Sequence, residues 1–446
     1  MVYPEAVKYL ESFVNYEQIK RYSYKKSFGL ERIKGFLRFI GNPEQKLKII
    51  HIAGSKGKGS TCAFTAYMLR EAGFSVGLYT SPHLSDFRER IRILKAGSAK
   101  RNLIFEGMIS RRNLASLAHD LKPAINKYNR ISKYGKLSFF EVYTALAFLY
   151  FKQKKVDFVV LETGLGGALD ATNAALSLVC AITPISYEHT QYLGSRISEI
   201  AGEKAAIIKQ NNRLVLSAVQ KKEARSVIRN RCADFNARLY EVGRDIKYSA
   251  RGRYFSVKGI NRKYGGLRLR LLGAHQLSNA ALAIGIVEAL SSSGVKISVA
   301  QIRRGLYNTL WPGRCEVLSY APLIVVDGAQ NVASAKVLKA AIKENFAKAG
   351  KYNKLILVFG ACLDKDIKGM LKQLSVLAEK IIFTSAQNAR SAPPASLPKY
   401  IRQRKKDIYI TNNVKEAKRL ALRLSEKDGL ILVTGSLFVV GAFRDA

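Results

Sequence analysis

Short apolar runs alternate with helical patterns between residues 48 and 217. The runs cover residues 48–53, 75–80, 158–162, 178–183 and 213–217, and the helical patterns cover 61–72, 139–153 and 197–209. At residues 158–162 the run is apolar without interruption up to a terminal acid, as in strands buried on both faces. Strands that alternate with helices in this order predict a parallel sheet with helices on both sides. We therefore expect a doubly wound α/β domain.

The pattern changes beyond this region. Alternating residues and turn glycines between 238 and 272 predict a small antiparallel β patch, and a helix is expected at 279–290. The sequence Trp311-Pro312-Gly313 interrupts the chain, so we predict two domains, residues 1–311 and 312–446. The second is predicted to be a smaller, Rossmann-like α/β domain. Its expected strands cover residues 323–326, 355–359, 380–384, 408–410 and 430–433.

Composition excludes several classes of protein. A chain with 48% hydrophobic and 10% aromatic residues is too apolar to be disordered. Its most apolar stretch, 431–443, contains polar residues and glycines and is too short to cross a bilayer. Residues 1–15 lack the apolar core of a signal peptide. The five cysteines are widely spaced without a CxxC pair, which indicates reduced thiols. We expect a cytoplasmic protein, a monomer, without a membrane partner.

The chain is strongly basic, with 74 Lys+Arg against 33 Asp+Glu and a net charge of +41. Such a charge attracts polyanions, more weakly as salt rises. The basic residues are spread along the sequence, without an arginine-rich tail or an RNP-like segment. We therefore predict no specific nucleic-acid partner, and favour a general solubility bias over a dedicated polyanion function.

A glycine-rich segment, HIAGSKGKGST at 51–61, joins a predicted strand to a predicted helix. Glycines let backbone amides turn toward phosphate oxygens, and the helix N-terminus adds partial positive charge. Lys58 can reach the terminal phosphates. The spacing differs from the ordinary P-loop, because only two residues separate Gly54 from Gly57 and Gly59 follows the lysine. Nucleotide binding is favoured over a glycine-rich turn with incidental lysines.

Three possible Mg²⁺ ligands follow predicted strands. Ser81 follows the second strand, Glu162 ends the run 158–162, and His189 follows the run 178–183. Mg²⁺ prefers oxygen ligands, and doubly wound sheets build their sites beyond the carboxyl ends of the strands. Each residue alone has an ordinary alternative, a turn for the serine and a structural role for the histidine. Together they predict a magnesium site.

The motifs resemble one family, folylpolyglutamate synthase/dihydrofolate synthase, a branch of the Mur ligase superfamily. The matching segments run in order along nearly the whole chain: 51–61, TSPHL at 80–84, LETGLGGALDATN at 161–173, EHTQYLG at 188–194, IAGEKAAIIK at 200–209, GAHQLSNA at 273–280, WPGRCE at 311–316, DGAQN at 327–331, DKD at 364–366 and TGSL at 434–437. The resemblance implies an ATP-dependent ligase. An acid, dihydropteroate or a (tetrahydro)folyl-polyglutamate, would become an acyl phosphate, and L-glutamate would displace the phosphate.

The resemblance also implies residue roles. The catalytic residues would be Lys58, Glu162, His189 and Lys204. Magnesium would be held by Ser81, Glu162, His189 and a carbamylated Lys204, which forms a second site. ATP would contact Gly57, Lys58, Gly59, Ser60, Asn279, Arg314 and Asp327. Weaker matches place Leu30, Arg32, Phe140, Gln330 and Ser436 beside the substrates. Simpler alternatives are a surface position for Lys204, a helix N-cap for Asn279 and a strand-end turn for Asp327.

Four positions depart from the family pattern: Ala168, Glu188, Gln330 and Val332. Ala168 removes a possible anion contact, and Glu188 lengthens a carboxylate beside His189. Gln330 cannot carry charge or shuttle a proton, which concerns glutamate recognition more than ATP binding. Two rival hypotheses remain, a Mur-type ligase for another acid and a degenerate ligase fold that binds polyanions. Retention of the phosphate-loop and metal residues favours the folate ligase.

Overall fold

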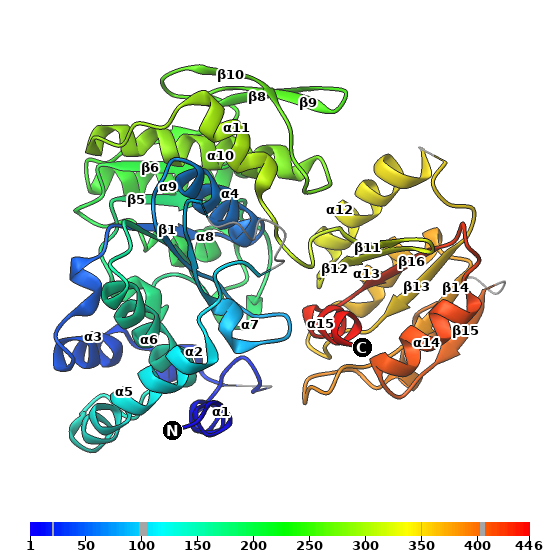
Figure 1. The fold of residues 1–446 in the computed structure, drawn as a ribbon, viewed down its shortest axis with the longest axis horizontal. Coiled ribbons are helices and arrows are strands. Elements are labelled where there is room, and N and C mark those ends of the chain that lie inside the picture. Colours follow the sequence, from blue (N-terminus) through cyan, green and yellow to red (C-terminus); the bar gives the residue numbers. More distant parts are fainter. Residues whose placement is uncertain (20–21, 98–104, 349, 402–405) are drawn as a thin grey trace.

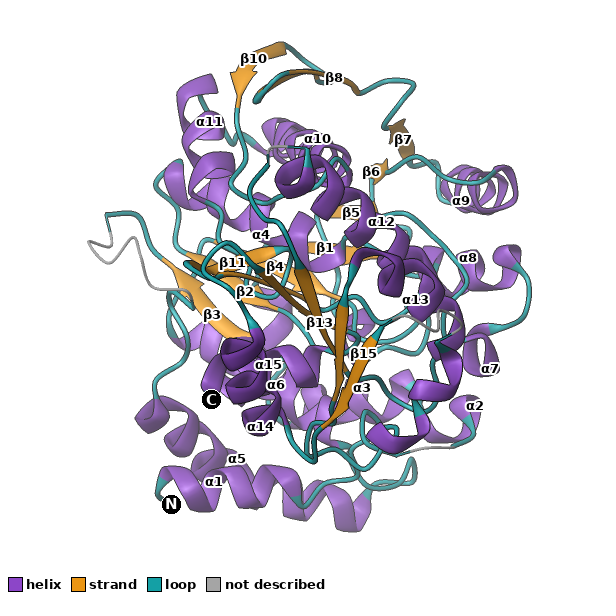
Figure 2. Ribbon diagram, turned by 90° about the vertical axis from the view of Figure 1, so that its right-hand side faces the viewer, coloured by secondary structure: helices purple, strands orange, loops and turns teal. Residues whose placement is uncertain are grey.

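The computed structural model describes residues 1–19, 22–97, 105–348, 350–401 and 406–446. The protein has two lobes, each built around its own sheet (Figure 1). The first lobe contains a seven-stranded sheet and a separate three-stranded sheet, and the second contains a six-stranded sheet. Both large sheets are covered by helices on two faces, which confirms the predicted α/β class (Figure 2).

The seven-stranded sheet has the strand order β3-β2-β4-β1-β5-β6-β7. Its strands are β1 (Ile49–Ala53), β2 (Val76–Tyr79), β3 (Ile91–Leu94), β4 (Phe158–Glu162), β5 (Val179–Ile182), β6 (Leu214–Ser217) and β7 (Arg238–Glu241). All neighbours are parallel except β2 and β3. The carboxyl ends of β1, β4 and β5 therefore lie along one edge, where their loops can meet.

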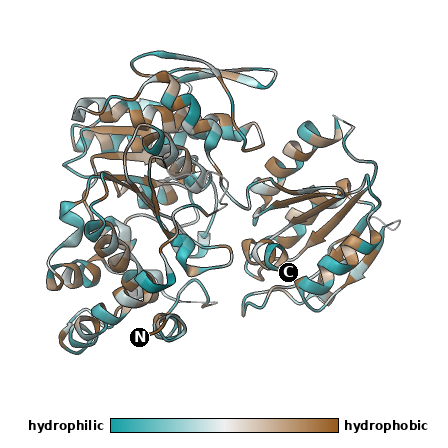
Figure 3. Ribbon diagram, viewed as in Figure 1, coloured by the Kyte–Doolittle hydropathy of each residue, from teal (hydrophilic) through white to brown (hydrophobic). Residues whose placement is uncertain are grey.

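Helices cover both faces of this sheet. They are α1 (Tyr3–Glu11), α2 (Tyr24–Ser27), α3 (Leu30–Phe39), α4 (Lys58–Glu71), α5 (Arg111–Ile131), α6 (Phe139–Gln153), α7 (Thr190–Leu193), α8 (Ile197–Ala205), α9 (Lys222–Asp234), α10 (His275–Ala289) and α11 (Val299–Asn308). Successive side chains of a strand point to opposite faces. In β1, Ile50 and Ile52 pack with α4 and α10, whereas Ile49 packs with α3 and α6. The central strands β1, β4 and β5 are accordingly mostly hydrophobic (Figure 3).

The predicted antiparallel patch is smaller than expected. It consists of β8 (Lys247–Arg251), β9 (Tyr254–Lys258) and β10 (Lys263–Leu267), in the order β10-β9-β8. The inward side chains Phe255, Val257 and Tyr264 join the same hydrophobic core as α10 and α11. The first part of the predicted patch, β7, instead pairs in parallel with β6. The prediction for that strand was wrong because its alternating pattern fits any half-exposed edge strand.

The second lobe has the strand order β11-β12-β16-β13-β14-β15, with only β11 antiparallel. Its strands are β11 (Glu316–Tyr320), β12 (Leu323–Asp327), β13 (Leu355–Phe359), β14 (Lys380–Phe383), β15 (Asp407–Ile410) and β16 (Leu430–Thr434). The helices α12 (Val332–Ile342) and α13 (Ile367–Leu374) cover one face, and α14 (Val414–Leu424) and α15 (Leu437–Asp445) cover the other. Leu84, in the loop after β2, packs into the α14–α15 side of this core and joins the lobes.

Other boundaries differ from the sequence expectations. The helix expected at 197–209 ends at Ala205, and the one expected at 279–290 already begins at His275. The edge strands β3 and β11 were not predicted. Among the described residues, no helix has the length and apolar character needed to cross a membrane.

Candidate functional site

A cavity of about 520 Å³ lies between the lobes. The first lobe lines it with the loops that follow β1, β2, β4 and β5 and with the start of α10. The second lobe contributes the loops after β12 and β13 and the start of α15. The cavity thus lies at the carboxyl edge of the first sheet, where the sequence places the phosphate loop and the metal ligands.

The phosphate loop approaches its neighbours too closely for side chains at two glycines. Gly57 has a φ of +81°, and a Cβ there would lie 2.3 Å from Oδ1 of Asn279. A Cβ on Gly59 would lie 2.7 Å from the indole ring of Trp311. The backbone amides of Ser55 and Lys56 both donate to the carbonyl of Pro184, at 3.1 Å each. These contacts fix the conformation of the loop. Its glycines are therefore needed both for close packing against Asn279 and Trp311 and for the approach of phosphates to the backbone.

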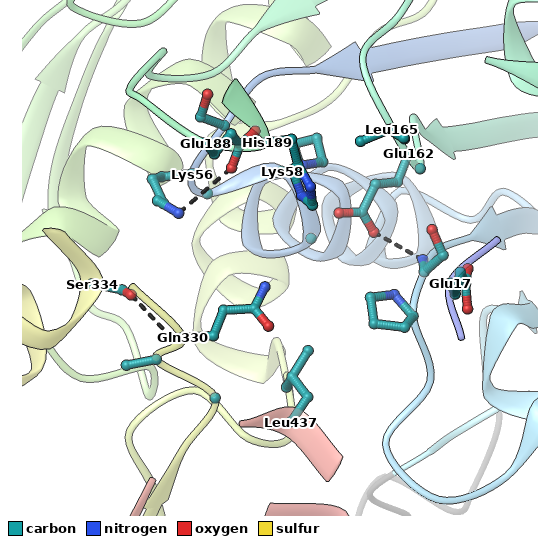
Figure 4. Close-up of a pocket in the computed structure, with 18 of the residues that line it drawn as sticks. Glu17, Lys56, Lys58, Glu162, Leu165, Glu188, His189, Gln330, Ser334 and Leu437 are labelled. Carbon is teal, nitrogen blue, oxygen red and sulfur yellow. Dashed lines mark hydrogen bonds and ion pairs between the residues drawn. The ribbon is translucent and has the colours of Figure 1, made fainter. Parts of the chain in front are cut away.

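Lys58 is the first residue of α4, three residues earlier than the predicted helix start. Its Nζ donates to the carbonyl of Gly54 at 3.0 Å, which folds the side chain back over the loop. Figure 4 shows Lys58 close to Glu162, with Gln330 and Leu437 of the second lobe on the facing side. The lysine therefore lies at a helix N-terminus beside a buried carboxylate.

Asn279 is buried, one turn into α10. Its Nδ2 donates to Oε1 of Gln276 at 2.9 Å, and its Oδ1 faces Gly57. The alternative of a helix N-cap is excluded, because the helix begins four residues earlier. The residue instead links α10 to the phosphate loop.

Glu162, at the end of β4, accepts a hydrogen bond from the backbone amide of Ser81 at 3.2 Å (Figure 4). Burial raises the pKa of this carboxyl, and Lys58 partly opposes that shift. Burial lowers the pKa of His189 to about 4, so the imidazole is neutral at pH 7 and able to accept a proton or a metal ion. His189 has a left-handed φ of 47° and precedes α7.

These residues provide part of a metal site. In the described ranges, no three His, Cys, Asp or Glu side chains are grouped closely enough to hold a metal ion by themselves. Mg²⁺ usually takes only one or two carboxylates and completes its shell with waters and substrate phosphates. The chemistry of the donor set, a nearly unpaired buried carboxylate beside a serine, fits such a shared site.

Lys204 is buried, with a side chain only 2% exposed, so the alternative of a surface lysine is wrong. Its Nζ donates to Oε1 of Glu188 at 2.9 Å, while Nζ of Lys56 lies 3.5 Å from the other carboxylate oxygen. Burial would raise the pKa of Glu188, but Lys204, Lys58 and Lys56 bring it well below its usual range. Burial lowers the pKa of Lys204 itself, and Glu188 partly opposes this. Glu188 is therefore a single carboxylate that interacts with three lysines.

The second lobe contributes Arg314, Asp327 and Gln330 to the cavity wall. Asp327 ends β12 and accepts hydrogen bonds from the amides of Cys315 and Ala329, each at 2.8 Å. Burial raises its pKa and Arg314 lowers it. The backbone amide of Gln330 donates to Oγ of Ser334 at 3.2 Å (Figure 4). Asp327 thus also serves as the strand-end turn residue.

The remaining substrate-side residues separate into two groups. Phe140 lines the cavity, whereas Leu30, Arg32 and Ser436 are absent from its lining. Nε of Arg32 donates to both carboxylate oxygens of Glu141, at 2.8 and 2.9 Å. Oγ of Ser436 accepts from the amide of Phe438 at 3.2 Å and caps α15. These residues support the lining rather than form it.

The sequence analysis missed an aromatic cluster at the cavity, made of Tyr16, Tyr22, Phe28 and Tyr192. The rings of Tyr22 and Tyr192 stack with centroids 4.4 Å apart and an interplanar angle of 9°. Tyr16 and Phe28 lie within 5.0 Å of one another between centroids. Local sequence patterns gave no sign of this cluster, because its members come from the segment between α1 and α2, the loop after α2 and helix α7.

Arg390 joins the lobes beside the cluster, and was also missed. Its guanidinium donates to the backbone carbonyl of Glu17 at 2.7 Å and to both carboxylate oxygens of Asp364 at 2.8 Å. The Glu17 carboxylate accepts from Arg90 at 2.8 and 2.6 Å. The N-terminal segment at the cavity therefore hydrogen-bonds to Arg90 of the first lobe and to Arg390 of the second lobe.

Comparisons with known proteins agree with this geometry. The Mur ligase middle domain family matches residues 114–287, and the Mur ligase glutamate ligase domain family matches residues 313–437. The dihydrofolate synthase/folylpolyglutamate synthase of Bacillus subtilis (strain 168) is 36% identical over 434 residues, which cover 93% of this chain and 94% of that protein.

Two solved structures are similar over nearly their whole length. The Mycobacterium tuberculosis folylpolyglutamate synthase complexed with ADP has a TM-score of 0.87 at 27% identity, covering 99% of this chain and 97% of that one. The Escherichia coli FolC in complex with DHPP and ADP has a TM-score of 0.84 at 27% identity, covering 100% and 97%. The chain therefore belongs to the folylpolyglutamate synthase/dihydrofolate synthase family of ATP-dependent ligases.

Proposed function

We propose that the cavity between the lobes binds ATP and joins L-glutamate to dihydropteroate, to folyl-polyglutamates, or to both. The observation that carries the proposal is that the phosphate loop, the buried Glu162 and the aromatic cluster all line one cavity. A nucleotide phosphate and the carboxylate of an aromatic acid can therefore meet there. A carboxylate oxygen attacks the γ-phosphorus, and the bond to ADP breaks. The neutral amine of glutamate then attacks the acyl carbon, phosphate leaves, and the amine loses a proton as the amide forms.

The chain's own groups meet the charge requirements of this reaction. Gly57 to Ser60 present backbone amides and a helix N-terminus to the phosphates. Lys58 exchanges the Gly54 carbonyl for a phosphate oxygen and stabilises the charge that develops in the transfer. Asn279 positions the loop. Arg314 and Asp327 contact the nucleotide from the second lobe, so both lobes must close on ATP.

Ser81, Glu162 and His189 would hold Mg²⁺, which supplies Lewis-acid polarisation of the phosphoryl oxygens when bound. We propose further that the neutral amine of Lys204 adds to CO₂ to form a carbamate: an N–C bond forms, one C–O π bond becomes a lone pair on oxygen, and the nitrogen releases a proton to solvent. The lowered pKa of Lys204 favours the neutral amine that this reaction needs. Because a carbamate beside Glu188 places two anions together, it also requires counter-charges, which Lys56 and a second magnesium ion would supply.

The aromatic cluster and Phe140 are proposed to contact the ring system of the acid, since aromatic side chains stack on planar rings. Arg32 would act only by positioning α3 and α6. Gln330 remains a proposed glutamate contact that forms hydrogen bonds without charge. We also propose that the domains meet at residues 311 and 312 and that the enzyme is a cytoplasmic monomer with reduced cysteines.

The test is ADP release with Mg²⁺-ATP and L-glutamate, with dihydropteroate and tetrahydrofolate offered separately. We expect turnover with at least one acid and none without glutamate. Turnover with dihydropteroate alone would assign only the dihydrofolate synthase activity. Turnover with neither acid would favour a ligase for another acid or a degenerate scaffold.

Arg390 holds the N-terminal segment that carries part of the aromatic cluster, and it provides a prediction about binding of the acid. We expect Arg390→Gln to raise KM for the acid about ten-fold, because a hydrogen bond from a charged group contributes about 1.5–3 kcal/mol. KM for ATP should change less than about two-fold, since the phosphate loop is untouched. Arg419→Gln, an exposed position on α14, is the matched control. Steady-state kinetics at varied acid and varied ATP would decide, and an equal rise in both KM values would contradict this role.

A further inference from the structure

The outer face of the β8–β10 sheet gathers positive charge. Glu288, a carboxylate that contacts this segment, is buried and accepts hydrogen bonds from the amides of residues 260–262 and from Oη of Tyr264. Residues 247–272 contain eight Lys or Arg and no Asp or Glu, whereas the whole chain has 74 against 33. The basic residues are Lys247, Arg251, Arg253, Lys258, Arg262, Lys263, Arg268 and Arg270. In Figure 1 this sheet lies at the top of the first lobe, and none of its residues lines the ligase cavity. The surface is therefore separate from the ligase cavity.

Strand register places three of these lysines side by side. Lys258 of β9 pairs directly with Lys247 of β8 on one side and with Lys263 of β10 on the other. Phe255 and Val257 are buried, so Lys258 belongs to the opposite, exposed face of the sheet. Like charges directly across strands destabilise a sheet. Throughout the described ranges, no carboxylate forms an ion pair with any of the three lysines. Repulsion among the three lysines thus destabilises the sheet, and an anionic ligand would remove this repulsion.

An exposed aromatic ring lies on the same face. Tyr254 is 47% exposed and pairs with Arg251, four residues along the strands from the lysine row. The Arg268 guanidinium lies 5.6 Å from the centroid of the Tyr254 ring and 5.4 Å from that of Tyr307. We call Lys247, Arg251, Tyr254, Lys258, Lys263 and Arg268 the basic face. Its cations and its ring lie together on a surface that is open to solvent.

We propose that the basic face binds single-stranded nucleic acid. Lysines neutralise phosphates, and exposed tyrosines and arginines stack on unpaired bases, which is how open surfaces hold single strands. Strands lie about 4.8 Å apart. The lysine row therefore spans about 10 Å, enough for about three phosphates of a helical strand. An exposed ring stacks on unpaired bases, which a duplex does not offer, and the face has no apolar wedge to enter a membrane.

This proposal revises the expectation drawn from sequence. Basic residues that are spread along a chain predicted no nucleic-acid partner, but folding brings the members of this segment onto one face. A solubility role for edge lysines is the simpler explanation, since charged edge strands prevent aggregation. That explanation does not require three lysines in direct register on all three strands, nor an exposed tyrosine on the same face.

The test uses the full chain and fluorescein-labelled 15-nucleotide oligomers of uridine and of thymidine, with anisotropy measured at several salt concentrations. We expect the triple variant Lys247→Gln, Lys258→Gln and Lys263→Gln to weaken binding at least ten-fold. The dependence of log K on log salt should fall by about two, since each phosphate contact contributes about 0.7 for single strands. Tyr254→Ala should weaken binding by about ten-fold at unchanged salt dependence. Comparison of the affinities for the two oligomers shows whether the basic face prefers RNA or DNA.

The matched control removes the same number of positive charges from the second lobe. It carries Lys368→Gln, Lys372→Gln and Lys415→Gln at exposed positions of α13 and α14. Equal losses in both triple variants would mean general attraction to a +41 chain and would overturn the proposal. Binding that survives the first triple variant would overturn it too. So would lysine-dependent binding to phosphatidylserine vesicles without any to the oligomers. ADP release should stay within two-fold of wild type in all variants, which verifies the fold.

Discussion

Lys58→Ala is expected to lower kcat for ADP release by about 10²–10³-fold while the melting temperature stays within a few degrees of wild type. Among the residues that the structure describes, no carboxylate lies within ion-pair distance of this lysine, and its Nζ hydrogen-bonds to the Gly54 carbonyl alone. Its loss therefore costs the fold little. In the reaction, the same amine neutralises charge on the transferring phosphoryl group, where no neighbouring cation of the loop can replace it because Lys56 faces Glu188.

The control for this variant is Lys46→Ala, at an exposed lysine before β1 that lies outside the cavity lining. It should leave kcat unchanged. Calorimetry with an ATP analogue adds a second measurement, in which Lys58→Ala binds the analogue more weakly. If Lys58→Ala turns over within about ten-fold of wild type, the phosphate loop does not have the role proposed for it.

The buried strands were predictable because burial on both faces demands apolar residues at successive positions. β4 coincides with its predicted bounds, β1 differs by one residue at its start, and β5 differs by one residue at each end. The edge strands β3 and β11 were not predicted, because an edge strand does not have to be apolar at successive positions. β3 contains Arg92, a buried arginine whose Nε donates to the carbonyl of Glu106 at 2.8 Å, and β11 is only half-buried. Neither gives a continuous apolar run.

The candidate site was predictable where a chemical role coincides with a strand end or a helix start. Lys58, Glu162 and His189 occupy such places and line one cavity. Arg390 and Glu17 illustrate the opposite case. They lie 373 positions apart, and their contact depends on how the two lobes pack together. No local spacing encodes that contact, and the aromatic cluster is hidden from sequence reasoning for the same reason.

Lys204→Arg is expected to lower kcat by about 10²-fold while leaving KM for ATP within a few-fold. Arginine keeps the positive charge and can still donate to Glu188, so a purely structural role would tolerate it. It cannot become a carbamate, because guanidinium stays protonated. In contrast, the buried Lys204 has a lowered pKa and therefore a larger fraction of neutral amine, the form that adds CO₂.

The direct readout is a carbamate carbon signal in ¹³C spectra of protein equilibrated with ¹³C-bicarbonate. Lys209 provides the matched control. Burial lowers its pKa to about 8, which also favours the neutral amine, but its Nζ already donates to the carbonyls of Asn173 and Ala175 at 2.5 and 2.7 Å. Lys209→Arg should therefore keep the signal and Lys204→Arg should lose it. Bicarbonate removal should slow wild-type turnover and leave Lys204→Arg unaffected. If the signal survives in Lys204→Arg, or if that variant turns over like wild type, the amine acts only through its hydrogen bond to Glu188, and the second magnesium site has no ligand on α8.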